Sequence, residues 1–365
     1  MLQRHIPFIN TSELCLIERT KLLFNWSGEP VMSASNSMSR RSMLALLASI
    51  SAASVLRPAQ AATKLVLSSG YPDNSQMVRN NRAFAEALNS RLSGKVQAEV
   101  YGNAALYKVP ETKRAVQTGQ VQMGEIFLAG LANENPIFAL DGLPFLATTL
   151  DQAGALWQVQ RPYVEKLFDE AGLKLLFGVA WPAQSLFSNK PLNTFSDLAG
   201  TKFRIQNPTT ARLAELMKVT GVRVETADLP QAFLTGIIQG MYTSNATGAG
   251  AASWDYCKYI YETNAWYPKN VTFINKRVFE KMPEAIQAVI LEEAAVAEKR
   301  GWAMEQEETA KANALLREHG VQVLPPPEDL MSQFRKIGDI MTEEWLASAG
   351  SDGKAAIAEY RKLTA

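Results

Sequence analysis

The sequence contains little cysteine and little histidine, with two of each among its 365 residues. Cys15 and His5 fall within the first 61 residues, which leaves only Cys257 and His319 in the rest of the chain. A single cysteine cannot form a disulfide within that part. A zinc site, a Cys–His pair or a Ser–His–Asp triad would need more such residues, or would need His319, which we expect to end a helix. We therefore expect no disulfide, no metal and no cofactor, and we expect Cys257 to be a small core residue.

Neither sign of charge dominates the chain. Residues 1–61 carry six Lys and Arg and three Asp and Glu, so the remaining residues carry 31 basic and 33 acidic side chains, a net charge of −2. Such a balance gives no reason to expect nucleic acid or an anionic membrane surface as a partner. The sequence also lacks a C-x-x-C-H haem motif and a G-x-G-x-x-G motif, which argues against an exported oxidoreductase.

No apolar run near the start is long enough to span a bilayer. The run Met43–Leu56 has 14 residues, follows the pair Arg40 and Arg41, and leads to an Ala-x-Ala site at 59–61. These are the parts of a cleaved export signal rather than of a membrane anchor. The paired arginines are also typical of the twin-arginine route, although ordinary signals contain such pairs as well. We interpret residues 1–61 as upstream residues and an export signal that is removed, with the true start codon after Met1.

The remaining residues, about 300 of them, suggest two lobes rather than one core. In the first half, apolar spacing predicts three strands, at Leu65–Ser68, Val96–Val100 and Val121–Ile126. It also predicts two helices, one with an apolar face of Met77, Phe84, Leu88 and Leu92, and one from Glu111 to Thr118. A second series follows, with a strand at Phe203–Ile205, a helix at Thr209–Val219, a strand at Val222–Glu225 and a helical turn at Gln231–Thr235. This alternation predicts an α/β fold with a largely parallel sheet.

A long helical pattern without proline runs from Pro283 to Arg317. At 1.5 Å per residue it would extend roughly 50 Å, which is longer than one lobe. Its apolar positions do not sustain the heptads of a coiled coil. We therefore expect one helix that bridges both lobes, a rigid break at Pro325–Pro327 and a final helical segment at Leu330–Leu346.

One arginine stands at a position suited to hold a small acid. Arg204 lies in the predicted strand Lys202–Ile205, which Pro208 ends just before a predicted helix. The planar guanidinium of arginine stays charged and matches a carboxylate with two parallel hydrogen bonds. The alternative is a surface or structural ion pair, which is the ordinary role of such a residue.

Several motifs in a fixed order resemble one family, the solute-binding proteins of the tripartite ATP-independent periplasmic (TRAP) transporters. The segment from Asp197 to Arg204 is similar to the D-L-x-G-x-K-x-R motif of that family. Four further segments also resemble it: Leu106–Glu111, Val116–Gly124, Leu143–Leu146 and Gly236–Gly240. The resemblance implies a periplasmic protein that captures an organic acid and delivers it to the TRAP membrane permease subunits, with no bond made or broken.

The resemblance also implies the architecture. Members of this family have a two-lobed fold like that of other periplasmic binding proteins, with a long helix that spans both lobes. The chain crosses between lobes more than once, so we expect lobe I to contain residues 64–185 and about 276–315. Lobe II would contain residues 186–275 and about 316–365. The ligand would bind in the cleft between the lobes, beyond the carboxyl ends of strands.

By resemblance, Arg204 binds the ligand carboxylate, and the segment Gly240–Gly248 forms a ligand-contacting loop. Many members have D-G-x-E-N at this point, with the asparagine on the ligand. Here Gln239 replaces the acid and Thr243 falls where the asparagine would be, so only the position carries over. Ser244 and Asn245 supply further hydrogen-bonding groups, although a turn without function would have this composition too.

Aromatic residues suggest the character of the ligand. Trp181 precedes the expected lobe crossing, with Gln184 close behind it, and the resemblance places Tyr71, Tyr107 and Phe127 toward the cleft. Each alone is more often a core residue than part of a ligand site. Together they suggest an apolar platform opposite Arg204, and hence a monocarboxylate with an apolar or aromatic body. A C4-dicarboxylate is the alternative ligand, and an ABC-type or sensor binding protein is the alternative receptor.

Overall fold

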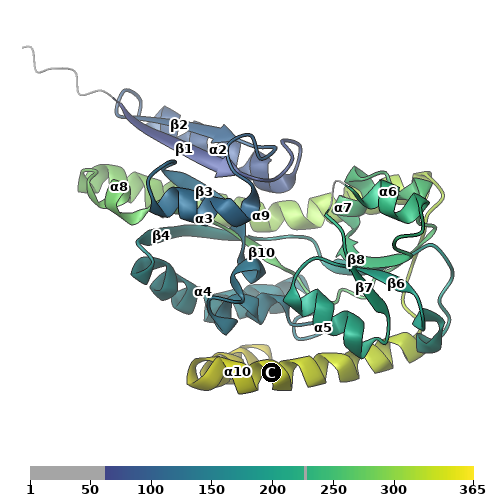
Figure 1. Cartoon of the computed structure of the whole chain (residues 1–365). Helices are drawn as coiled ribbons and strands as arrows, with labels where there is room; N and C mark the ends of the chain where they lie inside the picture. Colours follow the sequence, from purple (N-terminus) through teal and green to yellow (C-terminus); the bar gives the residue numbers. More distant parts are fainter. Residues whose placement is uncertain (1–61, 226–227) are drawn as a thin grey trace, which may run out of the picture. The chain divides into compact units, whose positions relative to one another are not determined.

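The computed structural model describes residues 62–225 and 228–365, which belong to one compact unit, Gln60–Ala365. The expected export signal lies outside the described residues. The described strands form two mixed sheets, one of five strands and one of six (Figure 1). None of the helices in the described part of the chain is long and apolar enough to cross a membrane.

The first sheet has the strand order β2-β1-β3-β10-β4. Its strands are β1 (Thr63–Ser69), β2 (Val96–Tyr101), β3 (Met123–Phe127), β4 (Leu173–Ala180) and β10 (Lys269–Asn275). β1 is parallel to β2 and β3, whereas β10 runs antiparallel to both of its neighbours. The first three strands and the two helices between them confirm the prediction from the sequence.

Alternating side chains of this sheet build a core on each face, because successive residues of a strand point to opposite sides. Leu65 and Leu67 pack under α2 (Gln76–Arg91) and the first half of α9 (Glu284–Glu318). Val66 packs with the opposite core, which α3 (Val109–Gln117) and α4 (Leu150–Glu170) cover. Two short 3-10 helices, η1 (Leu128–Leu131) and η2 (Pro136–Gly142), connect β3 to α4.

The second sheet has the strand order β11-β9-β5-β8-β6-β7. Its strands are β5 (Gln184–Ser188), β6 (Lys202–Ile205), β7 (Thr220–Arg223), β8 (Gly240–Ser244), β9 (Tyr259–Tyr261) and β11 (Gln322–Leu324). Shorter helical elements lie between them: η3 (Phe195–Leu198), α5 (Pro208–Leu216), α6 (Leu229–Leu234), α7 (Asn245–Gly250) and η5 (Ser253–Asp255), with α8 (Lys276–Glu280) following β10. β5 runs antiparallel to β8 and β9, so neither sheet is purely parallel.

Two long helices contact elements of both sheets. α9 packs on α2 and β4 of the first sheet, then on α7 and β11 of the second, which confirms the predicted bridging helix. α10 (Glu328–Thr364) begins beside the second sheet, where Phe334 is fully buried, and ends beside the first, where Tyr360 is buried. The predicted final helix is therefore too short, because α10 continues past a kink at Gly350, whose φ is +63°.

The expectation for the segment Gly240–Gly248 needs correction. The segment Gly240–Gly248 is not a loop: its first half is the buried central strand β8, and its second half begins helix α7. The lobe boundaries remain a prediction, but the strand pairing departs from them at β10. Residues 269–275, expected in lobe II, pair with β3 and β4 in the first sheet.

Candidate ligand-binding site

In the second sheet, the predicted polar residues meet at one edge. β6 and β8 are parallel, so Arg204 and Thr243 both lie near the carboxyl ends of their strands. β5 runs the opposite way and begins at that edge, where Gln184 pairs with Ser244. The strand order β5-β8-β6 therefore places these four residues on neighbouring strands. This edge is where open α/β sheets bind ligands.

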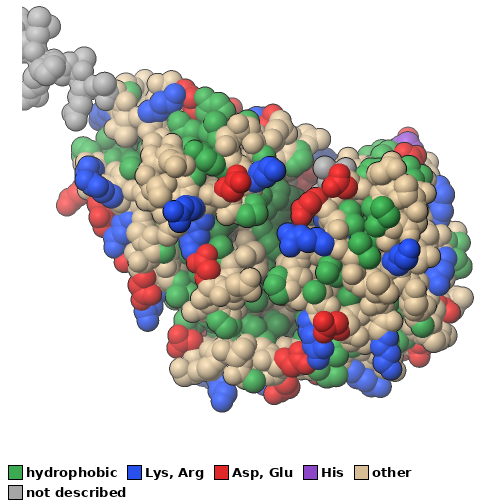
Figure 2. All heavy atoms as spheres, in the orientation of Figure 1, with side chains coloured by type: hydrophobic (Ala, Val, Ile, Leu, Met, Phe, Trp, Pro, Cys, Tyr) green, Lys and Arg blue, Asp and Glu red, His purple; other side chains and the backbone are tan. Residues whose placement is uncertain are grey.

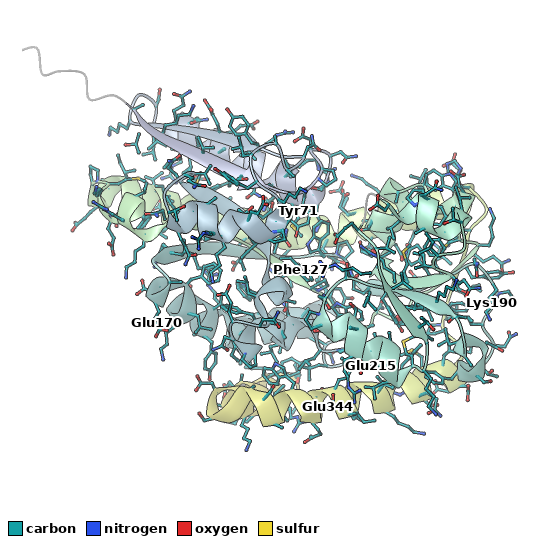
Figure 3. The ribbon with its side chains drawn as sticks, in the orientation of Figure 1. Tyr71, Phe127, Glu170, Lys190, Glu215 and Glu344 are labelled. Carbon is teal, nitrogen blue, oxygen red and sulfur yellow. The ribbon has the colours of Figure 1, made fainter. Side chains whose placement is uncertain are left out.

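The first sheet presents a corresponding edge made of aromatic residues. β1 ends two residues before Tyr71, β3 ends at Phe127, and β4 ends one residue before Trp181. The antiparallel strand β10 begins at the same edge, where Asn270 pairs with Phe127. In Figure 3 the labelled Tyr71 and Phe127 lie near each other at this end of their strands.

Two segments of the chain cross from one sheet to the other, and the two edges lie at opposite ends of these crossings. Residues 181–183 connect β4 to β5, and residues 262–268 connect β9 to β10. These segments are hydrogen-bonded to each other: Trp181 N donates to Pro268 O at 2.8 Å, and Gln184 N donates to Trp266 O at 2.9 Å. Figure 2 shows the surface hollowed near the middle of this face, with apolar side chains on its walls. The candidate site is therefore the region beside the paired crossings.

Arg204 is a buried residue rather than a surface one. Its side chain is only 4% exposed, and its Nε donates to the carbonyl of Val224, just after β7, at 2.9 Å. Burial lowers the pKa of its guanidinium to about 10, and the negative charge of Glu225 offsets part of that change. The group stays protonated at neutral pH. A fixed, desolvated cation at a strand end is suited to hold an anion.

Ser244, in contrast, has a structural role. Its side chain caps α7 by accepting a hydrogen bond from Thr247 N at 3.1 Å. An N-cap serine satisfies one of the free N–H groups at a helix start. Thr243 is buried in β8, and Gln184 donates to the carbonyl of Pro182 in the first crossing at 3.0 Å. The side chains of Ser244, Thr243 and Gln184 therefore form part of this edge of the second sheet.

Asn245 connects this edge to the bridging helix. Its Nδ2 donates to Asn313 Oδ1 on α9 at 2.6 Å, and Asn313 in turn donates to Glu262 at 2.7 Å. Asn245 is 3% exposed, and its Oδ1 has no hydrogen-bond partner among the described residues. A buried amide oxygen without a donor is costly, so this atom is available to a ligand or a water molecule.

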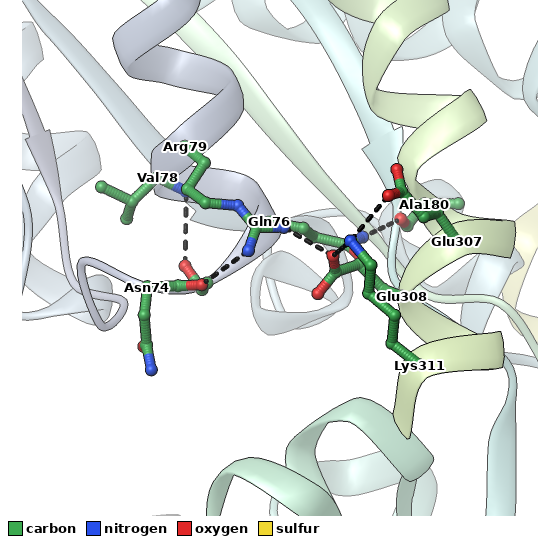
Figure 4. Close-up of polar contacts among 9 residues, drawn as sticks. Asn74, Gln76, Val78, Arg79, Ala180, Glu307, Glu308 and Lys311 are labelled. Carbon is green, nitrogen blue, oxygen red and sulfur yellow. Dashed lines mark hydrogen bonds and ion pairs between the residues drawn. The ribbon is translucent and has the colours of Figure 1, made fainter. Parts of the chain in front are cut away.

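Tyr71 and Trp181 form an ordered pair of rings. Their centroids are 5.2 Å apart with an interplanar angle of 55°. Trp181 Nε1 donates to Asn270 Oδ1 at 2.9 Å, and the Tyr71 hydroxyl donates to the same oxygen at 3.2 Å. The residue before Trp181 is held as well, because Gln76 Nε2 donates to the carbonyl of Ala180 at 2.9 Å (Figure 4). The pair is thus positioned by hydrogen bonds rather than by contact alone.

Behind this pair lies a buried carboxylate, Glu125. Its Oε1 accepts from Asn270 Nδ2 at 3.0 Å, and its Oε2 accepts from Ser69 Oγ at 2.6 Å. Burial raises the pKa of Glu125 to about 6, while the side chains of Asn270, Ser69 and Asn81 offset part of the rise. Burial also raises the pKa of the Tyr71 hydroxyl, and the charge of Glu125 raises it further. This cluster was not predicted.

The other two aromatic residues behave differently. Phe127 is half-buried at the end of β3, on the same edge as Tyr71 and Trp181. Tyr107 packs against the core on the α3 side and lines a surface recess with residues of β2 and of the α3–β3 connection. No described contact joins Tyr107 to Arg204 or to the ring pair. Its place in the site remains a prediction.

The remaining candidates for chemistry have structural explanations. Cys257 is fully buried in a core cluster of the second sheet, as predicted. His319 ends α9, also as predicted, and stacks on Trp254 with ring centroids 3.9 Å apart. Within residues 62–225 and 228–365, no three His, Cys, Asp or Glu side chains gather in a way that could hold a metal ion.

Comparison with known proteins gives a consistent result. The model of the bacterial extracellular solute-binding proteins, family 7, matches residues 67–348. The curated C4-dicarboxylate-binding periplasmic protein of Rhodobacter capsulatus is 27% identical over 249 residues, which cover 65% of this chain and 72% of that protein.

Solved structures are also similar. An extracytoplasmic solute receptor of Bordetella pertussis that binds pyroglutamic acid is 41% identical, with a TM-score of 0.79, and the match covers 82% of this chain and 100% of that chain. A marine metagenome TRAP solute-binding protein specific for pyroglutamate is 30% identical, with a TM-score of 0.78, over 82% of this chain and 99% of that chain.

Proposed function

Because the chain belongs to family 7 of the bacterial extracellular solute-binding proteins, which serve TRAP transporters and bind small organic acids, we propose that its ligand is a cyclic monocarboxylate of the pyroglutamate type. The observation that carries the proposal is the similarity to two pyroglutamate-binding proteins at 41% and 30% identity. The similarity to the C4-dicarboxylate-binding protein is lower, at 27%. The family consists of receptors rather than enzymes, so the protein would bind and release its ligand unchanged.

The chemistry of the candidate site supports a ligand of this kind. Pyroglutamate has one carboxylate and a flat lactam ring without a second charge. We assign the carboxylate to Arg204, whose guanidinium can form two parallel hydrogen bonds with it. We assign the ring to the faces of Tyr71 and Trp181, since the polar atoms of both side chains are already directed to Asn270. Flat rings pack well on such faces.

Basic side chains that the structure describes near the aromatic edge are already paired with acids: Arg79 pairs with Glu308 at 2.6 Å (Figure 4), and Lys269 lies beside Asp141. Lys269 begins β10 at this edge, but its side chain is fully buried, and its Nζ lies 3.9 Å from Asp141 Oδ2. The backbone N–H of Lys269 also donates to Asp141, at 2.7 Å. The Lys269 side chain is therefore held in the protein interior, on the face of the first sheet that α4 covers. A C4-dicarboxylate, which remains the alternative ligand, would have to find its second cation elsewhere.

The cellular role follows from the family. Its members act outside the cytoplasm, and we propose that this protein delivers its ligand to the membrane permease subunits of a TRAP transporter. Export through the signal proposed for residues 1–61 would place it in the periplasm. The lobes would close around the ligand by bending at the two hydrogen-bonded crossings, which are the short connections between the sheets.

The ligand that the protein carries from the cell would test this proposal. We would express residues 62–365 with an export signal, purify the protein without denaturation and identify the bound molecule by native mass spectrometry followed by release. The proposal predicts pyroglutamate or a close cyclic relative, and predicts its absence from an Arg204→Ala preparation. Recovery of succinate or another C4 diacid would reject the proposed ligand class.

A further inference from the structure

Glu125 is a buried acid of the aromatic edge, and its charge is not balanced there. The residue is 2% exposed, and its hydrogen bonds come from the neutral side chains of Ser69 and Asn270. Across the described residues, no lysine, arginine or histidine forms an ion pair with it. A buried charge without a partner is costly, so its retention in a core strand needs an explanation.

The register of the sheet places Glu125 directly behind the proposed ligand platform. Glu125 and Phe127 lie on the same face of β3, because side chains two residues apart point to the same side. On β1, Ser69 pairs with Glu125, and Tyr71 follows two residues later. On β10, Thr272 pairs with Glu125, and Asn270 pairs with Phe127. The Glu125 carboxylate therefore lies on the same face of the sheet as Phe127, two residues further from the edge along β3.

Glu125 also determines which way the Asn270 amide points. An ionised carboxylate only accepts hydrogen bonds, so it faces the NH₂ group of Asn270 and turns the amide oxygen outward. That oxygen receives the donors of both Tyr71 and Trp181. As a result, the ring pair presents its faces, and no N–H or O–H of the pair is left pointing at a ligand anion.

From this arrangement we propose that Glu125 is a specificity-determining residue that rejects a second carboxylate on the ligand, while it accepts a neutral amide at the same place. The inference rests on the proposed function, since it assumes that the ligand carboxylate is bound at Arg204. It explains how one site can bind pyroglutamate, in which the second carboxyl group of a five-carbon diacid has become an amide, and exclude the diacid itself.

The size of the effect follows from elementary electrostatics. Like charges ~10 Å apart, in a medium with an effective dielectric constant of ~20, weaken binding by about tenfold or more. The neutral amide has no such penalty. The hydrogen-bonded amide of Asn270 does not screen the repulsion as bulk water would, because Asn270 is itself only 2% exposed.

The test compares two ligands of nearly the same shape, glutarate and its monoamide glutaramate, by isothermal titration calorimetry. The variant is Glu125→Gln, which keeps the shape and an acceptor for Asn270 but removes the charge. The matched control is Glu99→Gln on β2, because Glu99 is a half-buried acid of the same sheet whose charge is paired, with Lys64 at 3.2 Å. Pyroglutamate is titrated into every protein, and thermal unfolding confirms that each variant is folded.

The wild-type protein should prefer glutaramate to glutarate by about tenfold or more, and Glu125→Gln should bring this ratio close to one. Glu99→Gln should keep the wild-type ratio, and pyroglutamate should bind the three proteins with similar affinity. An unchanged ratio in Glu125→Gln, with normal pyroglutamate binding, would overturn the role of Glu125 and leave the proposed function intact. Wild-type protein that prefers glutarate and ignores pyroglutamate would overturn both.

Discussion

The rings of Tyr71 and Trp181 lie 5.2 Å apart at an angle of 55°, and both side chains donate to the same oxygen of Asn270. These two hydrogen bonds therefore hold the rings in one arrangement. A preformed platform reduces the entropy lost on binding, because fewer rotamers have to be frozen. The ring pair, rather than either residue alone, is the element that we expect to select the ligand body.

Replacement of Trp181 tests the platform. Trp181→Ala should weaken pyroglutamate binding by more than the roughly 0.5–1.5 kcal/mol of an aromatic contact, because buried apolar area is lost as well. Trp181→Phe keeps a ring and should lose less. The control is Trp254→Ala, since Trp254 stacks on His319 away from the ring pair. Fluorescence or calorimetric titration would decide, and equal losses in the Trp181 and Trp254 variants would contradict the platform.

Replacement of Arg204 tests the carboxylate contact. Arg204→Ala should reduce affinity by about 2–5 kcal/mol, or roughly 30- to several-thousand-fold, because the ligand charge would be buried without a partner. Arg204→Lys should also bind more weakly, since lysine lacks the planar fork. Arg223→Lys on the neighbouring strand is the matched control, because that side chain is 72% exposed. Calorimetry that found wild-type affinity in Arg204→Ala would remove Arg204 from the site.

The raised pKa of Glu125 predicts a pH-dependent stability. Its pKa is about 6 in the folded protein and 4.5 by its ordinary value, so the folded state holds the proton more tightly. The resulting stabilisation is complete below the ordinary pKa and is lost as the pH rises through about 6. Relative to Glu125→Gln, the wild-type protein should therefore lose about 1 kcal/mol of unfolding free energy between about pH 5 and about pH 7.5. Urea denaturation of both proteins, each at both pH values, checks this; parallel pH profiles would contradict it.

The contact between α9 and β4 predicts a further effect on stability. A methyl group at Gly301 of α9 would overlap the Val179 side chain and Asn80 Nδ2. Gly301→Ala should therefore destabilise the protein by about 1–3 kcal/mol, as overpacking does. At Gly154 of α4 the nearest atom is 4.0 Å away, so Gly154→Ala should be neutral or gain up to about 1 kcal/mol of helix propensity. The melting temperature should fall in Gly301→Ala and stay unchanged or rise in Gly154→Ala; a similar fall in both would contradict this packing.

Local signals explain which parts of the site could be predicted from the sequence. The strand of Arg204 and helix α5 confirm their predictions, because Gly200 and Pro208 mark the turn and the helix start within a few residues. The segment after Gly240 was wrongly predicted as a loop. Its small polar residues are typical of turns, but Ser244 uses that polarity to cap α7, and the preceding residues are buried between β5 and β6.

The Glu125 cluster could not be found in this way. Glu125 and Asn270 are 145 residues apart, and only the pairing of β3 with β10 brings them together. Periodicity predicts that a segment is a strand, but it does not predict which strand pairs with it or in which direction. The antiparallel strands could therefore not be predicted, and the expectation of a largely parallel sheet was wrong. The available signal was Glu125, the one charged residue of the otherwise apolar strand β3; β10 contains several polar residues, so Asn270 does not stand out there. Because buried polar side chains are nearly always hydrogen-bonded, such a residue indicates a buried hydrogen-bond cluster.

The central claim is that this protein is a receptor for a cyclic monocarboxylate. The most direct measurement is a calorimetric titration of the protein, freed of ligand by unfolding and refolding, with L-pyroglutamate and with succinate under the same conditions. The account predicts one pyroglutamate per chain and an affinity for it well above that for succinate. Tighter binding of succinate, or no heat with pyroglutamate at millimolar concentrations, would contradict it.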